Sequence, residues 1–199
     1  VVDRPGSVQS ELLVSCPGPN RRTVDSWAPF PVLGYLVGGS PSARIDAVLR
    51  EDKGYTYGIR AGFHSWSVDG GFVTRGSVRA DSTVDAVRLL LGILEDAREG
   101  FSQDEAREGR DYVARTAPAR YATADAVADE VADLLLTELP LDFPTRTVTE
   151  VTELTPEALD AAWREWITGE WTLVVVGDAA SIVDGLRELG RGEVTVVPA

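Results

Sequence analysis

Arg50 and Tyr57 lie seven positions apart and are the residues best suited to hold a ligand. A helix that ends near Gly54 would deliver Arg50 close to its C-terminal end, and Tyr57 would begin the next strand. A guanidinium there can hold a peptide carbonyl or carboxylate, while a phenol can donate a hydrogen bond to developing negative charge. The alternative is that Arg50 only favours the helix C-terminus dipole and that Tyr57 packs in the sheet.

Metal chemistry has few candidate ligands in this sequence. His64 is the only histidine and Cys16 the only cysteine, and one of each cannot supply the common zinc ligand sets. Cys16 lies in an apolar, strand-like run and is expected to be a small core residue, whereas His64 is expected on a strand, at the surface or partly buried. A single cysteine excludes an intrachain disulfide and is compatible with a reducing compartment. We therefore predict no metal site in this chain.

The composition limits the class of partner. The 199 residues include 19 basic and 32 acidic side chains, giving a net charge of −13 that argues against nucleic acid. No run of about eighteen apolar residues suggests a membrane span, and no charged-then-apolar leader precedes the first strand. We leave the localisation open, with the cytoplasm favoured. Arginine strongly outnumbers lysine, which hints at a GC-rich bacterial source.

Hydrophobic periodicity predicts the secondary structure. Strands are expected from alternating or continuous apolar runs, helices from apolar spacing of three and four, and a β-hairpin with its turn at Gly70-Gly71. The expected order is a strand (7–15), two helices (23–37 and 40–54), the hairpin (55–67 and 72–79), helices (81–100, 102–118, 123–139 and 155–167), a strand (171–176), a helix (178–189) and a strand (193–197). This order favours an α+β, two-layer sandwich with a mainly antiparallel sheet and helices packed on one face.

Capping residues locate several helix starts. Ser40-Pro41 resembles an N-cap followed by proline at the first helical position, and Asp81-Ser82-Thr83 and Thr155-Pro156-Glu157 are similar starts. Ser102 and Glu105 have the spacing of a capping box. The helix over 123–139 carries one apolar face, made of Val127, Val131, Leu134 and Leu135.

The chain is expected to form a single domain over residues 1–199. Methionine is absent, including at position 1, and Val1 stands directly before the first expected strand, so a processed chain or a domain cut from a longer protein is expected. The run VVVGD contains only one glycine, Gly177, and lacks the further glycines of a dinucleotide-binding turn. We therefore interpret it as a structural turn.

The stretch from Leu36 to Gly58, LVGGSPSARIDAVLREDKGYTYG, resembles the signature of the C-terminal domain of pitrilysin/insulinase-type peptidases, including the mitochondrial processing peptidases. The matching residues, in order, are Gly38-Gly39, Ser42, Arg44, Leu49-Arg50-Glu51, Gly54 and Tyr57. The segments Arg4–Val14 and Leu173–Asp178 resemble the opening and closing strands of that domain, so the resemblance covers almost the whole chain. It implies a metallohydrolase-like domain of the pitrilysin and processing-peptidase type.

The resemblance also implies a function and a division of labour. In the family, an Arg and a Tyr seven positions apart reach across to a zinc-bearing domain and position the substrate, which assigns substrate binding to Arg50 and Tyr57. Tyr57 would also stabilise the tetrahedral oxyanion as an auxiliary catalytic residue. The inverted zinc motif H-x-x-E-H of the family is missing here. Zinc, its ligands and the base are therefore expected in a partner domain or subunit, which would cleave a peptide substrate together with this chain.

Two other functions stay open at this stage. Related domains also serve as non-catalytic scaffolds or peptide-binding subunits, and the missing metal motif is compatible with that role. A stand-alone enzyme using only its own residues is the weaker alternative. The sequence favours the substrate-binding half of a zinc metalloendopeptidase that is inactive alone.

Overall fold

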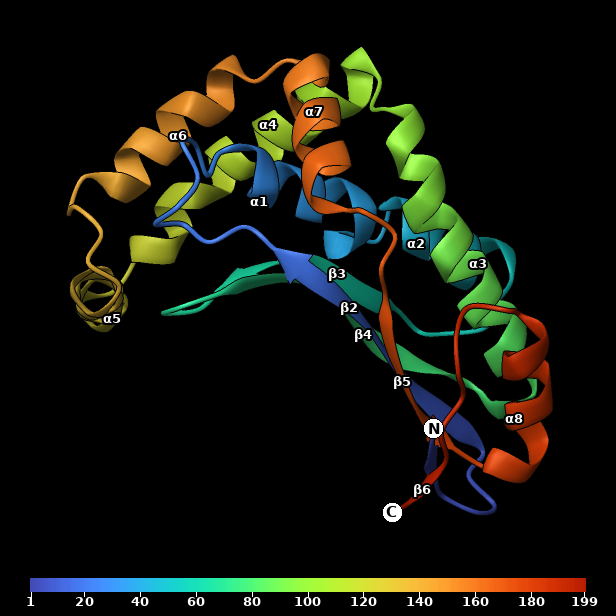
Figure 1. The fold of residues 1–199 in the computed structure, drawn as a ribbon. Helices are drawn as coiled ribbons and strands as arrows, with labels where there is room; N and C mark the ends of the chain where they lie inside the picture. Colours follow the sequence, from blue (N-terminus) through green and yellow to red (C-terminus); the bar gives the residue numbers. More distant parts are fainter.

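A six-stranded sheet forms one layer of the protein in the computed structural model, which describes all 199 residues. The strand order is β3-β4-β2-β5-β1-β6 (Figure 1). The strands are β1 (Val2–Asp3), β2 (Gln9–Gly18), β3 (Ile59–Ser65), β4 (Gly70–Arg79), β5 (Thr172–Gly177) and β6 (Val197–Pro198). The pairs β3–β4, β4–β2 and β2–β5 are antiparallel, while β1 runs parallel to both β5 and β6.

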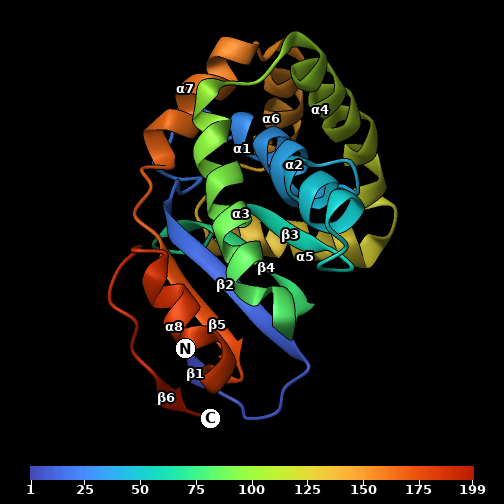
Figure 2. The same cartoon turned by 90° about the vertical axis from the view of Figure 1, so that its right-hand side faces the viewer.

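The helices gather on one side of this sheet (Figure 1), and α3 and α8 lie in front of it in the view of Figure 2. They are α1 (Pro29–Gly34), η1 (Tyr35–Gly39), α2 (Arg44–Asp46), η2 (Ala47–Asp52), η3 (Ala80–Ser82), α3 (Thr83–Asp96), η4 (Ala97–Glu99), α4 (Gln103–Thr116), η5 (Ala117–Tyr121), α5 (Ala124–Leu136), α6 (Phe143–Glu153), α7 (Pro156–Trp166) and α8 (Ala179–Glu188). The segments η1 and η2 are π-helical, and η3, η4 and η5 are 3₁₀ turns. None of these helices has the length and apolar composition that crossing a membrane requires.

Alternation along β2 shows why the sheet is covered on one face. Leu12, Val14 and Cys16 are buried towards the helices, whereas Glu11 and Leu13 lie on the other face and are exposed. Side chains along a strand point alternately to the two faces, so one apolar set faces the core. The predicted α+β, two-layer architecture with helices on one face is confirmed.

The core lies between the sheet and the helices α3 and α7. Leu90, Leu91 and Leu94 of α3 are almost completely buried. Trp163 of α7 is also buried, and its ring meets Phe72 of β4 edge-on, with ring centroids 5.3 Å apart and an interplanar angle of 81°. Edge-to-face contact of this kind adds to the stabilisation from burial alone.

Side-chain caps confirm three of the predicted helix starts. The Ser102 hydroxyl accepts a hydrogen bond from the backbone N–H of Glu105, and the Glu105 carboxylate accepts one from the backbone N–H of Ser102, so the capping box is complete. Thr123 and Thr155 cap α5 and α7 in the same way, each accepting from the third residue on. Each such cap satisfies a backbone N–H that has no partner inside the helix.

Several predicted boundaries were wrong. The helix expected to start at Ser40-Pro41 begins at Arg44. Its N-cap residue is Ala43, and no side chain caps the helix. Ser82 precedes α3 but makes no cap, because a 3₁₀ turn occupies residues 80–82. The last strand is limited to Val197–Pro198, since its neighbour β1 is itself only two residues long. Helix α6 has no counterpart among the predicted elements.

The hairpin turn also differs from the prediction. The bend falls at 66–69, where the backbone N–H of Trp66 donates to the carbonyl of Asp69 at 2.8 Å, and Gly70-Gly71 begin β4. A Cβ on Gly70 would stand 1.8 Å from the carbonyl oxygen of Pro19. Gly70 is therefore required for close approach of β2 and not for the turn.

Helix α5 divides the apolar face predicted for it. Only Leu134 is buried, while Val127, Val131 and Leu135 are exposed to 43%, 37% and 66%. The same helix turns Asp129, Glu130 and Asp133 towards the body of the protein, where they line a cavity. An ordinary surface helix buries its apolar stripe, whereas α5 buries only Leu134 of the four predicted residues.

Candidate functional site

The segment 36–58 begins where η1 packs directly on the edge strand β3. A Cβ added to Gly38 would lie 2.6 Å from the Cβ of Ala61, so no larger residue fits between the helix and the strand. Gly38 is therefore a packing residue. Its role in the segment is to bring the helical turn against the strand that follows Tyr57.

Arg44 connects the segment to the start of α4. Its Nε donates to Glu105 at 2.8 Å, its Nη2 donates to the carbonyl of Gly100 at 2.8 Å, and its guanidinium lies 4.4 Å from the centre of the Phe101 ring. Burial opposes the ionisation of Glu105, but the hydrogen bonds from Ser102 and Arg44 outweigh it, so the pKa of Glu105 lies below its ordinary value. Two of the three guanidinium nitrogens of Arg44, Nε and Nη2, are thus engaged within the protein.

Arg50 lies on η2, whose hydrogen bonds are those of a widened helical turn. The backbone N–H of Lys53 donates to the carbonyl of Val48 at 3.0 Å, five residues back, and that of Tyr55 donates to Leu49 at 2.9 Å. Single π-helical turns of this kind occur frequently at functional sites. The Arg50 side chain is 39% exposed, and its one ionic neighbour is Glu51, with Nε and Oε1 3.4 Å apart. Its guanidinium is accessible to a ligand.

Tyr57 was predicted to begin a strand, but β3 starts only at Ile59, so Tyr57 lies in the short connection from η2 to β3. Gly54 adopts the left-handed conformation, with φ of 64°, and turns the chain out of the helix. The carbonyl of Tyr55 accepts a hydrogen bond from the N–H of Arg79 at 2.9 Å, and the Thr56 hydroxyl donates to the carbonyl of Ser77 at 2.6 Å. The backbone around Tyr57 is therefore attached to β4, yet the Tyr57 side chain is 93% exposed.

The buried carboxylate of Asp46 binds the end of this connection, where β3 begins. Its Oδ1 accepts a hydrogen bond from the backbone N–H of Ile59 at 2.8 Å, and its Oδ2 accepts one from Nη1 of Arg60 at 2.9 Å. Asp46 is fully buried, whereas the Arg60 side chain is 54% exposed. The start of β3 is thus held to α2, one turn before Arg50. Sequence reasoning missed Asp46, because an aspartate inside a predicted helix shows no sign of a partner thirteen residues later.

Arg50 and Tyr57 flank one turn and both side chains reach solvent. No hydrogen bond joins them, and neither lines any of the larger cavities. The alternative interpretation, in which Tyr57 only packs in the sheet, does not describe the structure, since Tyr57 is exposed. The arrangement offers a guanidinium and a phenol to a ligand that approaches from outside.

The two residues considered as metal ligands do not come together. Cys16 is buried on the helix-covered face of the sheet, where burial raises the pKa of its thiol to about 11. His64 is exposed on the edge strand β3, with its ring parallel to that of Trp66 at a centroid distance of 6.2 Å. The protein contains no group of three or more His, Cys, Asp or Glu side chains arranged to hold a metal ion. These residues do not fit a zinc site.

Comparison with known families decides the assignment. The family model described as "Peptidase M16 inactive domain" matches residues 1–112, which include the whole of the segment 36–58. The chain belongs to the peptidase M16 family, as its inactive domain. The predicted resemblance to the non-zinc domain of these peptidases is confirmed. A search of curated protein sequences finds no match.

Solved structures share the fold of this M16 domain. A peptidase M16 inactive domain from Pseudomonas fluorescens has a TM-score of 0.80 at 21% identity, over 88% of this chain and 42% of that one. A protease from Helicobacter pylori has a TM-score of 0.76 at 15% identity, over 88% and 43%. A chain of complex III2 from Candida albicans has a TM-score of 0.77 at 12% identity, over 96% and 48%. The M16 domain described here therefore spans less than half the length of each of these chains.

Proposed function

We propose that this M16 inactive domain is the substrate-binding half of a zinc-dependent metalloendopeptidase. It would complete the active site of a separate zinc-bearing domain or subunit that carries H-x-x-E-H. The observation that carries the proposal is the contrast at Tyr57, an exposed side chain without a hydrogen bond on a backbone attached to β4. An exposed phenol on a fixed backbone can meet a partner without a large rearrangement.

Each residue has a separate role in this proposal. The Arg50 guanidinium would bind a carbonyl or carboxylate of the peptide, and the Tyr57 hydroxyl would donate a hydrogen bond to the oxyanion of the tetrahedral intermediate. Asp46 would act as a positioning residue, because it holds the backbone that follows Tyr57. Zinc, when bound in the partner, would supply the activated water.

The test combines the chain with an H-x-x-E-H domain or subunit from the same or an adjacent gene and measures peptide hydrolysis. Tyr57→Phe should lower kcat by about 10²-fold, the usual effect of losing one oxyanion donor. Arg50→Ala should mainly raise KM. Full activity in both variants would refute the assigned roles.

Matched controls separate these roles from general disturbance of the surface. Tyr55→Phe removes a hydroxyl two residues away, and Arg88→Ala removes an exposed guanidinium on α3 that pairs only with Asp85. Both control variants should keep wild-type kcat and KM. The same assay without the zinc-bearing half should show no turnover, and turnover by this chain alone would favour a stand-alone enzyme.

A non-catalytic scaffold is the second candidate function. It is favoured by the family description as an inactive domain and by the fold shared with a chain of complex III2. A scaffold would bind its partner, and neither Arg50→Ala nor Tyr57→Phe would change the rate of peptide hydrolysis. Partner binding with unchanged kinetics in both variants would therefore support this second function.

A further inference from the structure

A sizeable open cavity lies away from Arg50 and Tyr57, beside helix α5. Its volume is about 700 Å³, and its walls come from α1 and η1, the end of α4 with η5, α5 and α6. Small-molecule sites typically have volumes of about 300–1,000 Å³. The cavity is therefore large enough for a side chain or a small organic molecule.

Aromatic rings form much of the cavity wall. Tyr35 and Tyr112 stack with centroids 4.0 Å apart and an interplanar angle of 20°, and the Tyr35 hydroxyl donates to Glu108 at 3.0 Å. Trp27, Tyr121 and Phe143 line other parts of the cavity. The faces of such rings attract ammonium and guanidinium groups.

Carboxylates from α5 face the same space. Asp129, Glu130 and Asp133 all line the cavity, while Val127, Val131 and Leu135 of the same helix are exposed. Asp129 is exposed and so lies near the mouth, whereas Glu130 is half-buried. Burial and then the nearby Glu130 carboxylate raise the pKa of Tyr121, with Arg120 acting in the opposite direction. Glu130 thus lies close to an aromatic wall of the cavity.

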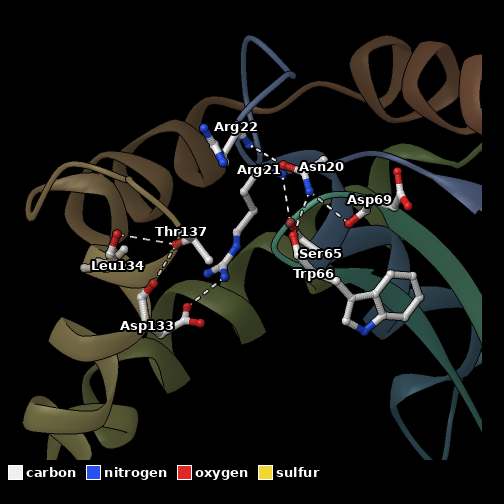
Figure 3. Close-up of polar contacts among 9 residues, drawn as sticks. All are labelled: Asn20, Arg21, Arg22, Ser65, Trp66, Asp69, Asp133, Leu134 and Thr137. Atoms are coloured by element: carbon white, nitrogen blue, oxygen red, sulfur yellow. Dashed lines mark hydrogen bonds and ion pairs between the residues drawn. The ribbon is translucent and has the colours of Figure 1, made fainter.

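The protein's own cations neutralise only part of this negative charge. Nη2 of Arg21 donates to Asp133 at 2.7 Å, and the backbone N–H of Arg21 donates to the hydroxyl of Ser65 at 3.0 Å (Figure 3). Arg120 also lines the cavity, but its side chain is exposed and forms no ion pair. Asp129 and Glu130 likewise have no ion-pair partner within 4.0 Å. Two carboxylates therefore stay available beside the rings.

We propose that this cavity binds an organic cation carried on an apolar arm, of the kind that an arginine or lysine side chain provides. The arm would lie against the stacked rings of Tyr35 and Tyr112, and the charged end would meet Glu130, with Asp129 at the mouth. Carboxylate and ring face attract the same charge, so the two contributions act together.

Calorimetric titration of the 199-residue chain tests this assignment. The probes are Nα-acetylarginine methylamide and its citrulline counterpart, which has nearly the same shape but no charge. The arginine probe should bind, and the citrulline probe should bind at least about fivefold more weakly because a cation has been removed. Equal binding of the two probes, or no heat from either at millimolar concentration, would overturn the proposal.

Two variants of α5 locate the site. Glu130→Gln should weaken binding of the arginine probe by about fivefold, the contribution of a partly solvated ion pair. Asp125→Asn removes the same charge from the same helix, but Asp125 does not line the cavity, so it should leave the affinity unchanged. An equal loss in both variants would reveal general attraction to a chain of net charge −13 and would refute a specific site. The assay omits any zinc-bearing half, so its outcome is independent of the proposed peptidase role.

Discussion

The carboxylate of Asp46 is fully buried and accepts the backbone N–H of Ile59 at 2.8 Å, which holds the start of β3 to α2. Asp46→Ala would leave this buried N–H without a partner and would remove the ion pair between Asp46 and the exposed Arg60. An unpaired buried donor costs about 1–3 kcal/mol, so we expect the free energy of unfolding to fall by about 2 kcal/mol. Urea denaturation measures this change.

A matched variant tests whether burial of the acid matters. Asp52→Ala removes a carboxylate from the same segment, but Asp52 is exposed and pairs only with Lys53. Exposed pairs contribute little, so this variant should lose at most about 0.5 kcal/mol. Equal losses in the two variants would contradict a structural role for Asp46.

Gly38 should be intolerant of alanine, whereas Gly92 should accept it. A Cβ on Gly38 would lie 2.6 Å from the Cβ of Ala61, while a Cβ on Gly92 in α3 would meet nothing within 4 Å. Overpacking typically costs about 1–3 kcal/mol, and replacing a helical glycine by alanine in open space stabilises by up to about 1 kcal/mol. Thermal unfolding of Gly38→Ala and Gly92→Ala should therefore move the melting temperature in opposite directions. A shift in the same direction would contradict the close contact of η1 and β3.

The layers of this fold follow from patterns that the sequence displays openly. The alternation of apolar residues in β2 and their spacing in α3 correctly predicted a strand and a helix, because each pattern indicates which side faces the core. Leu12 and Leu90 are buried as those patterns require. Ser102 and Glu105 were found by spacing, since a capping box is a purely local arrangement.

What the sequence did not predict depends on contacts between distant segments. Gly70 was assigned to a turn, although the backbone of Pro19 requires a glycine there. The inward carboxylates of α5 and the bond from Asp46 to Ile59 likewise arise only after folding. For the candidate site, spacing and resemblance were sufficient to select Arg50 and Tyr57. The sequence could not predict that both side chains are exposed, nor which hydrogen bonds hold the backbone around Tyr57.

Glu105 should make the stability depend on pH in the acidic range. Its folded pKa lies below the ordinary value of 4.5, so its contribution is fully present above pH 4.5 and is lost as the pH falls through the folded pKa. At pH 7, Glu105→Gln should lower the free energy of unfolding by about 1 kcal/mol, because the cap and the bond to Arg44 are weakened. Denaturation at pH 7 and pH 3 should show this difference shrinking at the lower pH. A difference that grows on acidification would contradict the assignment.

Cys16 should resist alkylation while the protein is folded. Burial is the main cause that raises the pKa of its thiol to about 11, so almost no thiolate exists at pH 8. Iodoacetamide at pH 8 should modify the chain only in denaturant, as mass spectrometry can show. Rapid modification of the native protein would place Cys16 outside the core.

Neighbouring leucines on α5 provide the sharpest test of how this helix is oriented. Leu134 is 1% exposed, whereas Leu135 is 66% exposed. Leu134→Ala should therefore lower the free energy of unfolding by about 2–4 kcal/mol, through lost burial and the cavity left behind, while Leu135→Ala should change it by less than about 0.5 kcal/mol. Urea denaturation of both variants measures the contrast. A larger loss for Leu135→Ala would mean that α5 turns its apolar stripe inwards, and its carboxylates would then face solvent instead of the cavity.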